Sequence, residues 1–347
     1  MKTVDYIVVG LGIAGIAICE ELLKNRHSFV VVDNGEKGAT ANSGGVFNPT
    51  VLKRFSAAWN TSLFYPKAIQ FYRELCVKLD VDFFQEMPIL RVFKSVEEQN
   101  DWSVASDKND LKHFLSSQIL QNENQNIKAP LGYGRVEGTA RIQTADLLQS
   151  YRSFLDRDDK LIAEEFDYAS LLVLEDNVIY KDIKAKKVIF CEGPRVRENP
   201  FFPKDAIIPN KGVYVIIKSE GLDLQALLKG PFYIIPMDNS QYKVGATFGA
   251  GIEDATATVN AKIEILSKLE TMINCSYQVI GETTGIRPTT RDRKPLLGAF
   301  SHNPKMAFLN GLGSRGFTMA PLLAQILYGH MEKDIPIPPE MDINRIK

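Results

Sequence analysis

The sequence has few cysteines and histidines, with four of each among 347 residues. The cysteines are scattered, without a Cys-x-x-Cys spacing or a Cys/His ligand pattern. They therefore predict neither a disulfide framework nor a metal site, and they fit a reducing cytoplasm. No uncharged apolar run reaches the length of a membrane span, and no signal peptide precedes the first apolar run. We therefore expect a cytoplasmic protein without a membrane span.

An excess of charge is also absent, because 41 Lys and Arg oppose 42 Asp and Glu, for a formal net charge of −1. This balance gives no general sign of a nucleic-acid partner, although it leaves a local basic patch open. The chain is 45% hydrophobic and 24% charged, as expected for a globular protein. Its length predicts one large domain or two interlocked ones.

The strongest motif lies in residues 4–33. An apolar run up to Val9 breaks into GLGIAG, a helical pattern follows, and a second apolar run ends on Asp33. This order predicts a strand, a tight turn, a helix and a strand, the unit that binds a dinucleotide. Gly10 permits the turn, Gly12 lets the backbone approach a pyrophosphate, and Gly15 lets the helix lie close to the strand.

The residues around these glycines complete the expected contacts. Ile13 and Ala14 stand at the helix N-terminus, where free N–H groups favour phosphates. We expect Asp33 to hold ribose hydroxyls, which disfavours NADP, and Asn34 to lie beside it. The motif alone does not separate FAD from NAD, and a glycine-rich turn in an ordinary α/β domain is the alternative.

A second signal is the long run of small residues over 35–49, GEKGATANSGGVFNP. Such a loop inside a folded domain suggests a second contact surface for an extended cofactor. An extended cofactor favours FAD over NAD. The predicted contacts here are Thr40, Ala41, Ser43, Gly44, Gly45 and Val46.

The middle of the chain predicts elements but little chemistry. We expect helices over 59–79, after Thr144 and over 256–272, and helical pieces in the polar segment 96–125. Expected strands are 83–84, 89–93, 134–143, 161–166, 171–174 and 187–191. Phe166 and Gly193, near the ends of two of these, are predicted to approach the cofactor. Strands at short intervals over 207–248 predict a separate antiparallel sheet.

The second informative region is C-terminal, with ETTGIRPTTRDRKPLLG at 282–298 and AFLNGLGSRGFTMAP at 307–321. In the second segment an apolar strand again enters a glycine-rich turn and then a helix. That helix N-terminus is expected to point at a bound group. The turn supplies the candidate contacts Gly311, Gly313, Ser314, Arg315, Gly316, Phe317 and Thr318.

Taken together, these motifs resemble the D-amino-acid oxidase / glycine oxidase family of FAD proteins over nearly the whole chain. Within that family, TRDRKPLLG and LGSRGFTMAPLLAQIL resemble the FAD domain of the bifunctional enzyme that modifies the tRNA wobble uridine. The methyltransferase domain of that enzyme has no counterpart here. The resemblance implies an α/β plus α+β fold with an interleaved, discontinuous FAD-binding domain. We expect a Rossmann-type FAD-binding domain over 1–80, 135–205 and 281–347, and a smaller antiparallel-sheet substrate domain over 81–134 and 206–280.

The resemblance also implies the chemistry, which is hydride transfer from the carbon next to an amine nitrogen to flavin N5. The turn at 311–318 has no cysteine to bond flavin, so FAD is expected to be non-covalent. Arg287 stands where the amino-acid oxidases grip the substrate carboxylate. An ion pair with Asp292 or Glu282 is the alternative role for Arg287.

Other site residues follow from the same resemblance. Tyr233 matches a tyrosine that lies over the substrate, although an ordinary strand tyrosine is an equal alternative. Phe248 is expected to form an apolar wall. Arg315 is offset by one position from an arginine of glycine oxidase, so its contact with substrate stays open, as does that of Arg291. The histidines lie outside these motifs and are expected at the surface, which leaves no evident general base.

The sequence thus leaves several functions to compare. The first is an FAD-dependent oxidoreductase acting on a small amine or amino acid, such as a glycine-like compound, an N-substituted glycine or a D-amino acid. The second oxidises a carboxymethylaminomethyl group of tRNA, which the charge balance disfavours. A non-catalytic FAD protein and an NAD-dependent dehydrogenase are the remaining hypotheses. The dehydrogenase hypothesis does not explain the loop over 35–49. Oligomeric state and electron acceptor are open.

Overall fold

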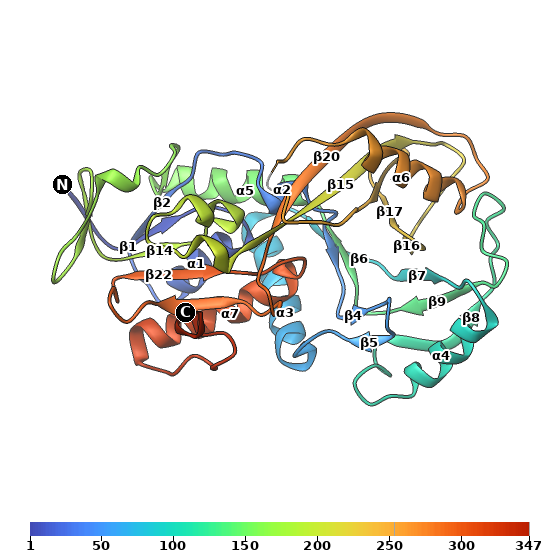
Figure 1. Cartoon of the computed structure of the whole chain (residues 1–347), viewed down its shortest axis with the longest axis horizontal. Helices are drawn as coiled ribbons and strands as arrows, with labels where there is room; N and C mark the ends of the chain where they lie inside the picture. Colours follow the sequence, from blue (N-terminus) through green and yellow to red (C-terminus); the bar gives the residue numbers. More distant parts are fainter. Residues whose placement is uncertain (253, 347) are drawn as a thin grey trace.

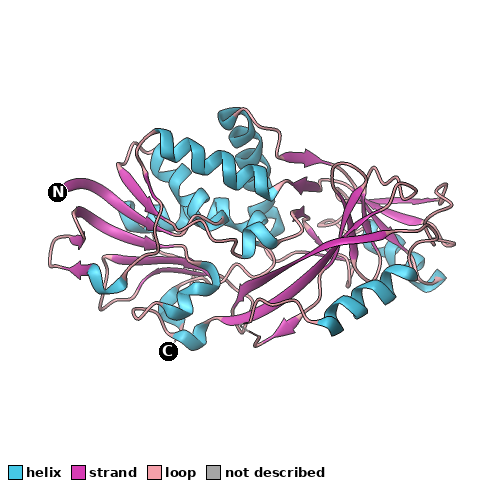
Figure 2. Cartoon of the chain, turned by 90° about the horizontal axis from the view of Figure 1, so that it is seen from above, coloured by secondary structure: helices cyan, strands magenta, loops and turns pink. Residues whose placement is uncertain are grey.

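The computed structural model describes residues 1–252 and 254–346, and it shows two lobes side by side (Figure 1). We call them the Rossmann lobe, built on an eight-stranded sheet, and the sheet lobe, built on a nine-stranded sheet. Helices gather on the Rossmann lobe, whereas strands dominate the other (Figure 2). This arrangement confirms the expected Rossmann-type fold with a separate sheet-rich part.

The Rossmann lobe has a mainly parallel centre. Strands β1 and β14 pair in parallel, and β2 and β22 pair in parallel outside them. The sheet comprises β11 (Leu161–Ile162), β2 (Phe29–Val32), β1 (Lys2–Val9), β14 (Ile183–Phe190), β13 (Val178–Tyr180) and β12 (Leu171–Val173), with β22 (Met306–Asn310) and β21 (Leu296–Ala299) beyond β14. The central strands are apolar and buried, as expected where helices cover a parallel sheet.

Four long helices cover one face of this sheet: α1 (Ile13–Lys24), α3 (Thr61–Leu79), α5 (Thr144–Arg157) and α7 (Gly316–Lys333). Helix α7 packs on both α1 and α3. The largest apolar core lies between these helices and the sheet, and a second core fills the opposite face. Residues near both ends of the chain therefore build one side of the lobe.

The sheet lobe is mainly antiparallel, with strands of two to twelve residues and one parallel pair. Its order is β19 (Gly249–Ala250), β15 (Ile208–Lys218), β18 (Gln241–Gly245), β17 (Tyr233–Pro236), β16 (Leu227–Lys229), β7 (Ile89–Val92), β9 (Tyr133–Val136) and β8 (Leu115–Leu120), with β20 (Gln278–Thr289) also paired to β15. Helix α6 (Val259–Glu270) covers one face over an apolar core, and α4 (Val96–Ser106) packs on β8. The other face is directed toward the site described below.

Short elements join the lobes. They are α2 (Ala39–Asn42), β3 (Val46–Phe47), β10 (Ala140–Ile142) and β6 (Phe84–Glu86), together with the hairpin of β4 (Thr50–Val51) and β5 (Ser56–Ala57). Single 3₁₀ turns occur at Tyr168–Ser170, Gly193–Glu198, Lys204–Ala206 and Ile343–Arg345. In the described part of the chain, no helix is long and apolar enough to cross a membrane.

Some expected elements differ in the structure. The single strand expected over 134–143 is two strands, β9 and β10, in different sheets. Gly138 stands between them at φ +67°, a conformation that interrupts a strand. Strand β13 was not expected, and only two residues of 161–166 form a strand. Strand β20 crosses position 281, where the expected domain boundary falls, so the proposed division of the chain stays a prediction at residue level.

Candidate functional site

The glycine turn after β1 has the geometry expected from its sequence. Gly10 adopts φ +92°, and a Cβ there would lie 2.8 Å from the Cys191 carbonyl oxygen. A Cβ on Gly15 would lie only 2.0 Å from the Gly10 carbonyl oxygen. Both positions therefore require glycine. The first turn of α1 leaves N–H groups without intrahelical partners, and only that of Ile13 is capped, by Thr40 Oγ1 at 3.1 Å.

Asp33 supports this turn from the end of β2. Its Oδ2 accepts a hydrogen bond from the Leu11 N–H at 2.8 Å, and its Oδ1 accepts one from the Gly35 N–H at 2.9 Å. Oδ1 also forms an ion pair with Arg152 of α5. The carboxylate thus lies at the dinucleotide turn, and contact with ribose hydroxyls stays a prediction. Arg152 was not among the predicted site residues, and it is 119 residues from Asp33 in the chain.

The small-residue loop connects the two lobes rather than lying free in solvent. It folds into α2 and β3, and Thr40 contacts the first turn of α1. At its other end, a Cβ on Gly44 would lie 2.7 Å from the Tyr214 hydroxyl and 2.6 Å from Ile235 of the sheet lobe. Gly45 adopts φ +64°. The loop therefore occupies the position that an extended cofactor reaching from one lobe to the other requires.

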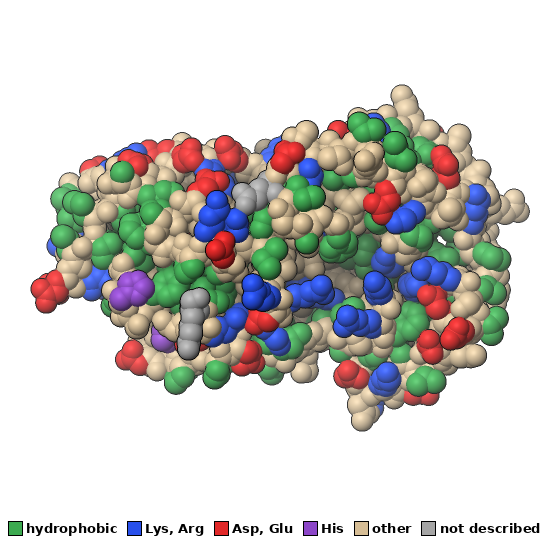
Figure 3. Space-filling model, in the orientation of Figure 1, with side chains coloured by type: hydrophobic (Ala, Val, Ile, Leu, Met, Phe, Trp, Pro, Cys, Tyr) green, Lys and Arg blue, Asp and Glu red, His purple; other side chains and the backbone are tan. Residues whose placement is uncertain are grey.

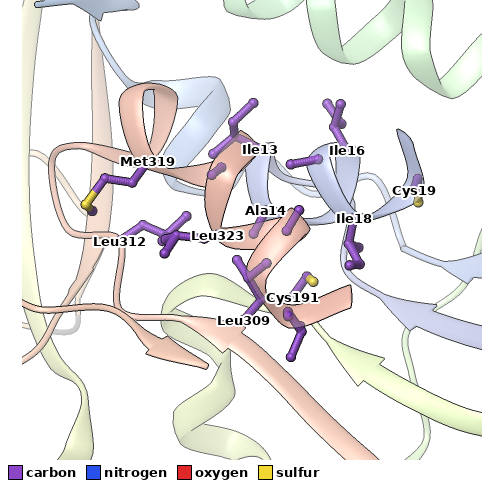
Figure 4. Close-up of a cluster of buried hydrophobic side chains, with 14 of the residues drawn as sticks. Ile13, Ala14, Ile16, Ile18, Cys19, Cys191, Leu309, Leu312, Met319 and Leu323 are labelled. Atoms are coloured by element: carbon purple, nitrogen blue, oxygen red, sulfur yellow. The ribbon is translucent and has the colours of Figure 1, made fainter. Parts of the chain in front are cut away.

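The C-terminal turn returns to the first one. Gly316 opens α7, where a Cβ would lie 3.1 Å from Ile13 Cγ2, so the N-termini of α1 and α7 meet. Figure 4 shows the apolar contacts behind this meeting, with Ala14 of α1 facing Leu323 of α7. Two glycine turns about 300 residues apart in the chain therefore form one wall.

A buried asparagine that the sequence did not single out ties two of these turns together. Asn310, at the end of β22, is 1% exposed. Its Nδ2 donates to the Gly193 carbonyl at 2.9 Å, and its Oδ1 accepts from the Gly311 N–H at 2.8 Å. Gly193 and Gly311 adopt φ +57° and +75°. The sequence feature that could have identified Asn310 is its position at the end of an apolar run, because a polar residue in a buried strand requires hydrogen-bond partners.

The other predicted cofactor residues lie around this wall. Phe166 is buried and stacks on Tyr180 at 4.3 Å between ring centroids. The Phe317 carbonyl accepts a hydrogen bond from Tyr72 at 2.8 Å, and Thr318 is buried. Asn34 Oδ1 accepts one from the Glu36 N–H at 3.0 Å. Ala41, Ser43, Val46, Gly313 and Ser314 belong to the small-residue loop and the C-terminal turn, and all these cofactor contacts stay predictions.

A buried carboxyl lies directly behind Gly10. Glu192 accepts hydrogen bonds from the Tyr168 hydroxyl and from Asn199 Nδ2, the latter at 2.9 Å. Burial raises the pKa of Glu192 to about 7, although Asn199 and Tyr168 oppose that shift. The ionisation of this group therefore falls near neutral pH, next to the dinucleotide turn.

Arg287, the predicted substrate residue, lies on the sheet lobe with its guanidinium over Gly212. A Cβ on that glycine would lie 2.2 Å from Arg287 Nη2. Nη1 donates only to neutral oxygens, those of Asn210 at 3.3 Å, Thr247 at 3.4 Å and Lys211 at 3.5 Å. Burial lowers the pKa of Arg287.

The internal ion pair weighed for Arg287 is not found among residues 1–252 and 254–346. Asp292 instead pairs with Arg345 at 3.0 Å, and Arg287 forms no ion pair with Glu282 or another described carboxylate. A largely buried guanidinium without a carboxylate partner is able to bind an anion from outside the chain.

Two aromatic residues flank this part of the site. The Phe248 ring lies 4.6 Å from Arg287 Cζ and is 74% exposed, so in the structure it forms an open edge rather than a buried wall. The Tyr233 hydroxyl accepts a hydrogen bond from Asn48 Nδ2 at 3.2 Å. Burial raises the pKa of Tyr233, while the charge of Arg315 nearby opposes that shift. Their contacts with substrate stay predictions.

Arg315, whose role the sequence left open, is anchored by the chain. It donates from Nη1 to the Asn48 carbonyl at 2.9 Å and from Nη2 to the Thr50 carbonyl at 3.0 Å. Burial lowers its pKa. It therefore fixes the β4–β5 hairpin next to Tyr233. By contrast, Arg291 is exposed.

Lys243 extends the predicted site, and His27 differs from its prediction. Lys243 of β18 was not predicted, yet its Nζ donates to the Ser43 carbonyl at 2.7 Å and lies over the Tyr214 ring. Burial lowers the pKa of Lys243 to about 8. The expectation that all histidines lie at the surface is wrong for His27. Its side chain is 19% exposed and packs between Tyr6 and Tyr328.

Comparison with known proteins agrees with this architecture. The family model "FAD dependent oxidoreductase" (DAO) matches residues 5–328. A glycine oxidase of Bacillus subtilis is 22% identical over 348 residues, covering 93% of this chain and 91% of that protein. The bifunctional tRNA-modification protein MnmC of Idiomarina loihiensis is 24% identical and covers 93% of this chain. This chain spans only 55% of that relative.

Solved structures show the same fold. The glycine oxidase of Bacillus cereus superposes with a TM-score of 0.80 at 18% identity, covering 96% of each chain. The iminodiacetate oxidase of Chelativorans sp. BNC1 superposes with a TM-score of 0.75 at 19% identity, covering 96% of this chain and 97% of that one. With the glycine turns, the bridging loop and the matched residues 5–328 in place, the chain belongs to the DAO family of FAD-dependent oxidoreductases, and FAD is its cofactor.

Proposed function

We propose that this chain oxidises the C–N bond of a small amine or amino acid that carries a carboxylate. Glycine-like compounds, N-substituted glycines and D-amino acids are the candidate substrates. The observation that carries the proposal is Arg287, whose largely buried guanidinium meets only neutral oxygens among the described residues. The printed activities of the glycine oxidase and iminodiacetate oxidase neighbours support it.

Each residue has a definite task in this proposal. FAD, held between the glycine turns that open α1 and α7, would supply the acceptor for the hydride of the carbon next to nitrogen, while water would take the proton from nitrogen and hydrolyse the imine. Arg287 grips the carboxylate with its planar fork and so orients the reacting carbon. The Tyr233 hydroxyl accepts from Asn48, so its own proton is available to the substrate. The N-terminus of α7 provides positive partial charge for negative charge that develops nearby.

The tRNA hypothesis is not favoured. The chain carries a net charge of −1. RNA binding relies on clustered Lys and Arg that neutralise phosphates. The proposed substrate is therefore a small molecule, and oligomeric state and electron acceptor lie outside the proposal.

The test is anaerobic reduction of the bound flavin by a panel of amines and amino acids, followed by its visible absorbance. We expect bleaching by at least one carboxylate-bearing amine. Arg287→Ala should slow that bleaching on the order of 100-fold at subsaturating substrate, because a charge-assisted bidentate contact is lost.

Arg135→Ala is the matched control, since Arg135 is an exposed arginine of the same sheet that pairs with Glu137. It should leave the rate of bleaching unchanged. Equal rates for Arg287→Ala and the wild type would overturn the assignment of Arg287. Bleaching by no amine would overturn the proposed function itself.

A further inference from the structure

A row of cations crosses the sheet lobe on the face that carries Tyr233. Lys229 of β16 pairs in register with Tyr233 of β17 on one side and with Arg91 of β7 on the other. Residues that pair across neighbouring strands project from the same face of a sheet. The opposite face is apolar and covered by α6, with Ile234 and Leu228 in its core. Arg91, Lys229 and Tyr233 therefore share the face toward the site.

Arg315 joins this row from the Rossmann lobe, and we call Arg91, Lys229, Tyr233 and Arg315 the Tyr233 cluster. Lys229 Nζ lies 5.0 Å from the Tyr233 ring centroid. The charges of Arg315 and Arg91 both act on the Tyr233 hydroxyl and oppose the rise of its pKa. Three cationic side chains thus surround one tyrosine.

The charges of the Tyr233 cluster are not balanced within residues 1–252 and 254–346. Only Arg91 has an acidic partner, Glu98 at 2.9 Å. Lys229 donates to the carbonyls of Gly230 at 2.7 Å and Pro231 at 3.0 Å. Burial, together with repulsion from Arg91 and Lys94, lowers the pKa of Lys229 to about 8. Cations held together without counterions favour the entry of an anion.

The surface view agrees with this placement. Lys and Arg side chains run across the middle of the face in Figure 3, beside a hollow between the two lobes. In the same orientation, the hollow lies between β17 and the β4–β5 hairpin, which Arg315 anchors (Figure 1). Tyr233 is on β17 and Arg315 anchors the hairpin, so the elements that carry these two residues border the hollow.

We propose that the Tyr233 cluster is a second anion subsite, and that the preferred substrate is an amine with two acidic groups. This rests on the proposed function, in which Arg287 holds the first carboxylate. Arg287 is on β20, four strands from Lys229 in the order β16–β17–β18–β15–β20. Strand register places Lys229 level with Thr283, four residues from Arg287 along β20, so the two backbones are on the order of 19 Å apart across the strands and about 13 Å apart along them. The second acid therefore belongs on an extended chain rather than next to the first one.

The test compares unreactive ligands of the FAD-loaded enzyme. Adipate, suberate and sebacate are titrated against hexanoate, octanoate and decanoate, with flavin absorbance changes and thermal shift as readouts. We expect one diacid to bind on the order of 10-fold or more tightly than its monoacid partner. Lys229→Met should remove that advantage without changing monoacid binding, and Lys229→Arg should keep it.

Lys268→Met is the matched control. Lys268 also lies over a neighbouring ring, that of Phe232 at 4.9 Å, but it is paired with Glu264 at 2.6 Å and exposed. It should keep the diacid advantage. Equal binding of diacids and monoacids in the wild type would overturn the inference, as would equal weakening of both by Lys229→Met. Displacement of bound hexanoate by tRNA but not by any diacid would also overturn it.

The outcomes separate this inference from the proposed function. If amines bleach the flavin but diacids show no advantage, only the second subsite fails. If no amine bleaches the flavin while the diacid advantage depends on Lys229, the oxidase proposal fails and the anion subsite stands. With both confirmed, amino acids bearing a distal acid should reduce the flavin faster at low concentration than glycine does.

Discussion

In the Rossmann lobe Asp33 is paired with Arg152, whereas in the sheet lobe Lys229 and Arg287 meet only neutral oxygens among the described residues. The first lobe pairs Asp33 within the chain and leaves backbone N–H groups at the start of α1 for a phosphate. The second lobe leaves whole side-chain charges uncompensated. This difference indicates that one lobe presents the backbone to a cofactor, and that the other presents side chains to acidic small molecules.

The largest expected effect comes from filling the glycine turn of the Rossmann lobe. Gly15→Val places side-chain atoms against the Gly10 carbonyl, where even a Cβ would lie at 2.0 Å. The variant should contain almost no flavin, measured as visible absorbance per protein after purification. Gly281→Ala is the control, because its Cβ would meet nothing closer than 3.8 Å. A flavin-loaded Gly15→Val protein would contradict the assigned role of the turn.

The next effect tests Glu192, a carboxyl of the Rossmann lobe that forms no ion pair among the described residues. Glu192 has its pKa raised from 4.5 to about 7, so the folded state holds its proton more tightly than the unfolded one. The associated stability is present below about pH 4.5 and is lost as pH rises through about 7. Glu192→Gln should therefore match wild type near pH 5 and exceed it at pH 8 by up to about 3 kcal/mol.

Urea unfolding at the two pH values, with FAD in fixed excess, measures this effect. Glu198→Gln is a suitable control, because Glu198 lies in the same turn but is largely exposed. A stability difference that is the same at both pH values would show that Glu192 does not titrate as described.

A smaller effect is expected from replacing Asp33, the carboxylate that pairs with Arg152. Asp33→Asn weakens the pair with Arg152 and the bonds to the Leu11 and Gly35 N–H groups. FAD affinity, measured by flavin fluorescence on the apoprotein, should fall on the order of 10-fold. Arg152→Met should cost less, because those two backbone bonds remain. If Arg152→Met weakened FAD binding more than Asp33→Asn, Arg152 rather than Asp33 would be the cofactor contact.

The smallest effect is expected where charges are paired in solvent. Arg73 and Glu86 lie 2.6 Å apart with side chains 61% and 49% exposed. Arg73→Gln should change the free energy of unfolding by less than about 1 kcal/mol and leave flavin content unchanged. A larger loss would mean that pairing alone, and not burial, distinguishes the two lobes.

The sequence by itself determined the dinucleotide unit, because its signals are local. Strand period, helix period and the spacing of Gly10, Gly12 and Gly15 all lie within 33 residues. The C-terminal turn was predicted for the same reason, whereas the meeting of its helix with α1 is seen only in the structure (Figure 4). The steric requirements of a backbone turn depend on residues that are adjacent in sequence, so they can be predicted without knowledge of the fold.

Tertiary structure alone decided which charged side chains meet. Lys229 lies beside Arg91 through strand register, and Asp33 pairs with Arg152 across 119 residues. The two strands within 134–143 were likewise divided between sheets by pairing partners elsewhere in the chain. Charge pairing and sheet register depend on distances between remote segments, which hydrophobic period does not encode. The glycine turns were therefore set locally, whereas the unbalanced cations around Tyr233 arise only when the sheet lobe is assembled.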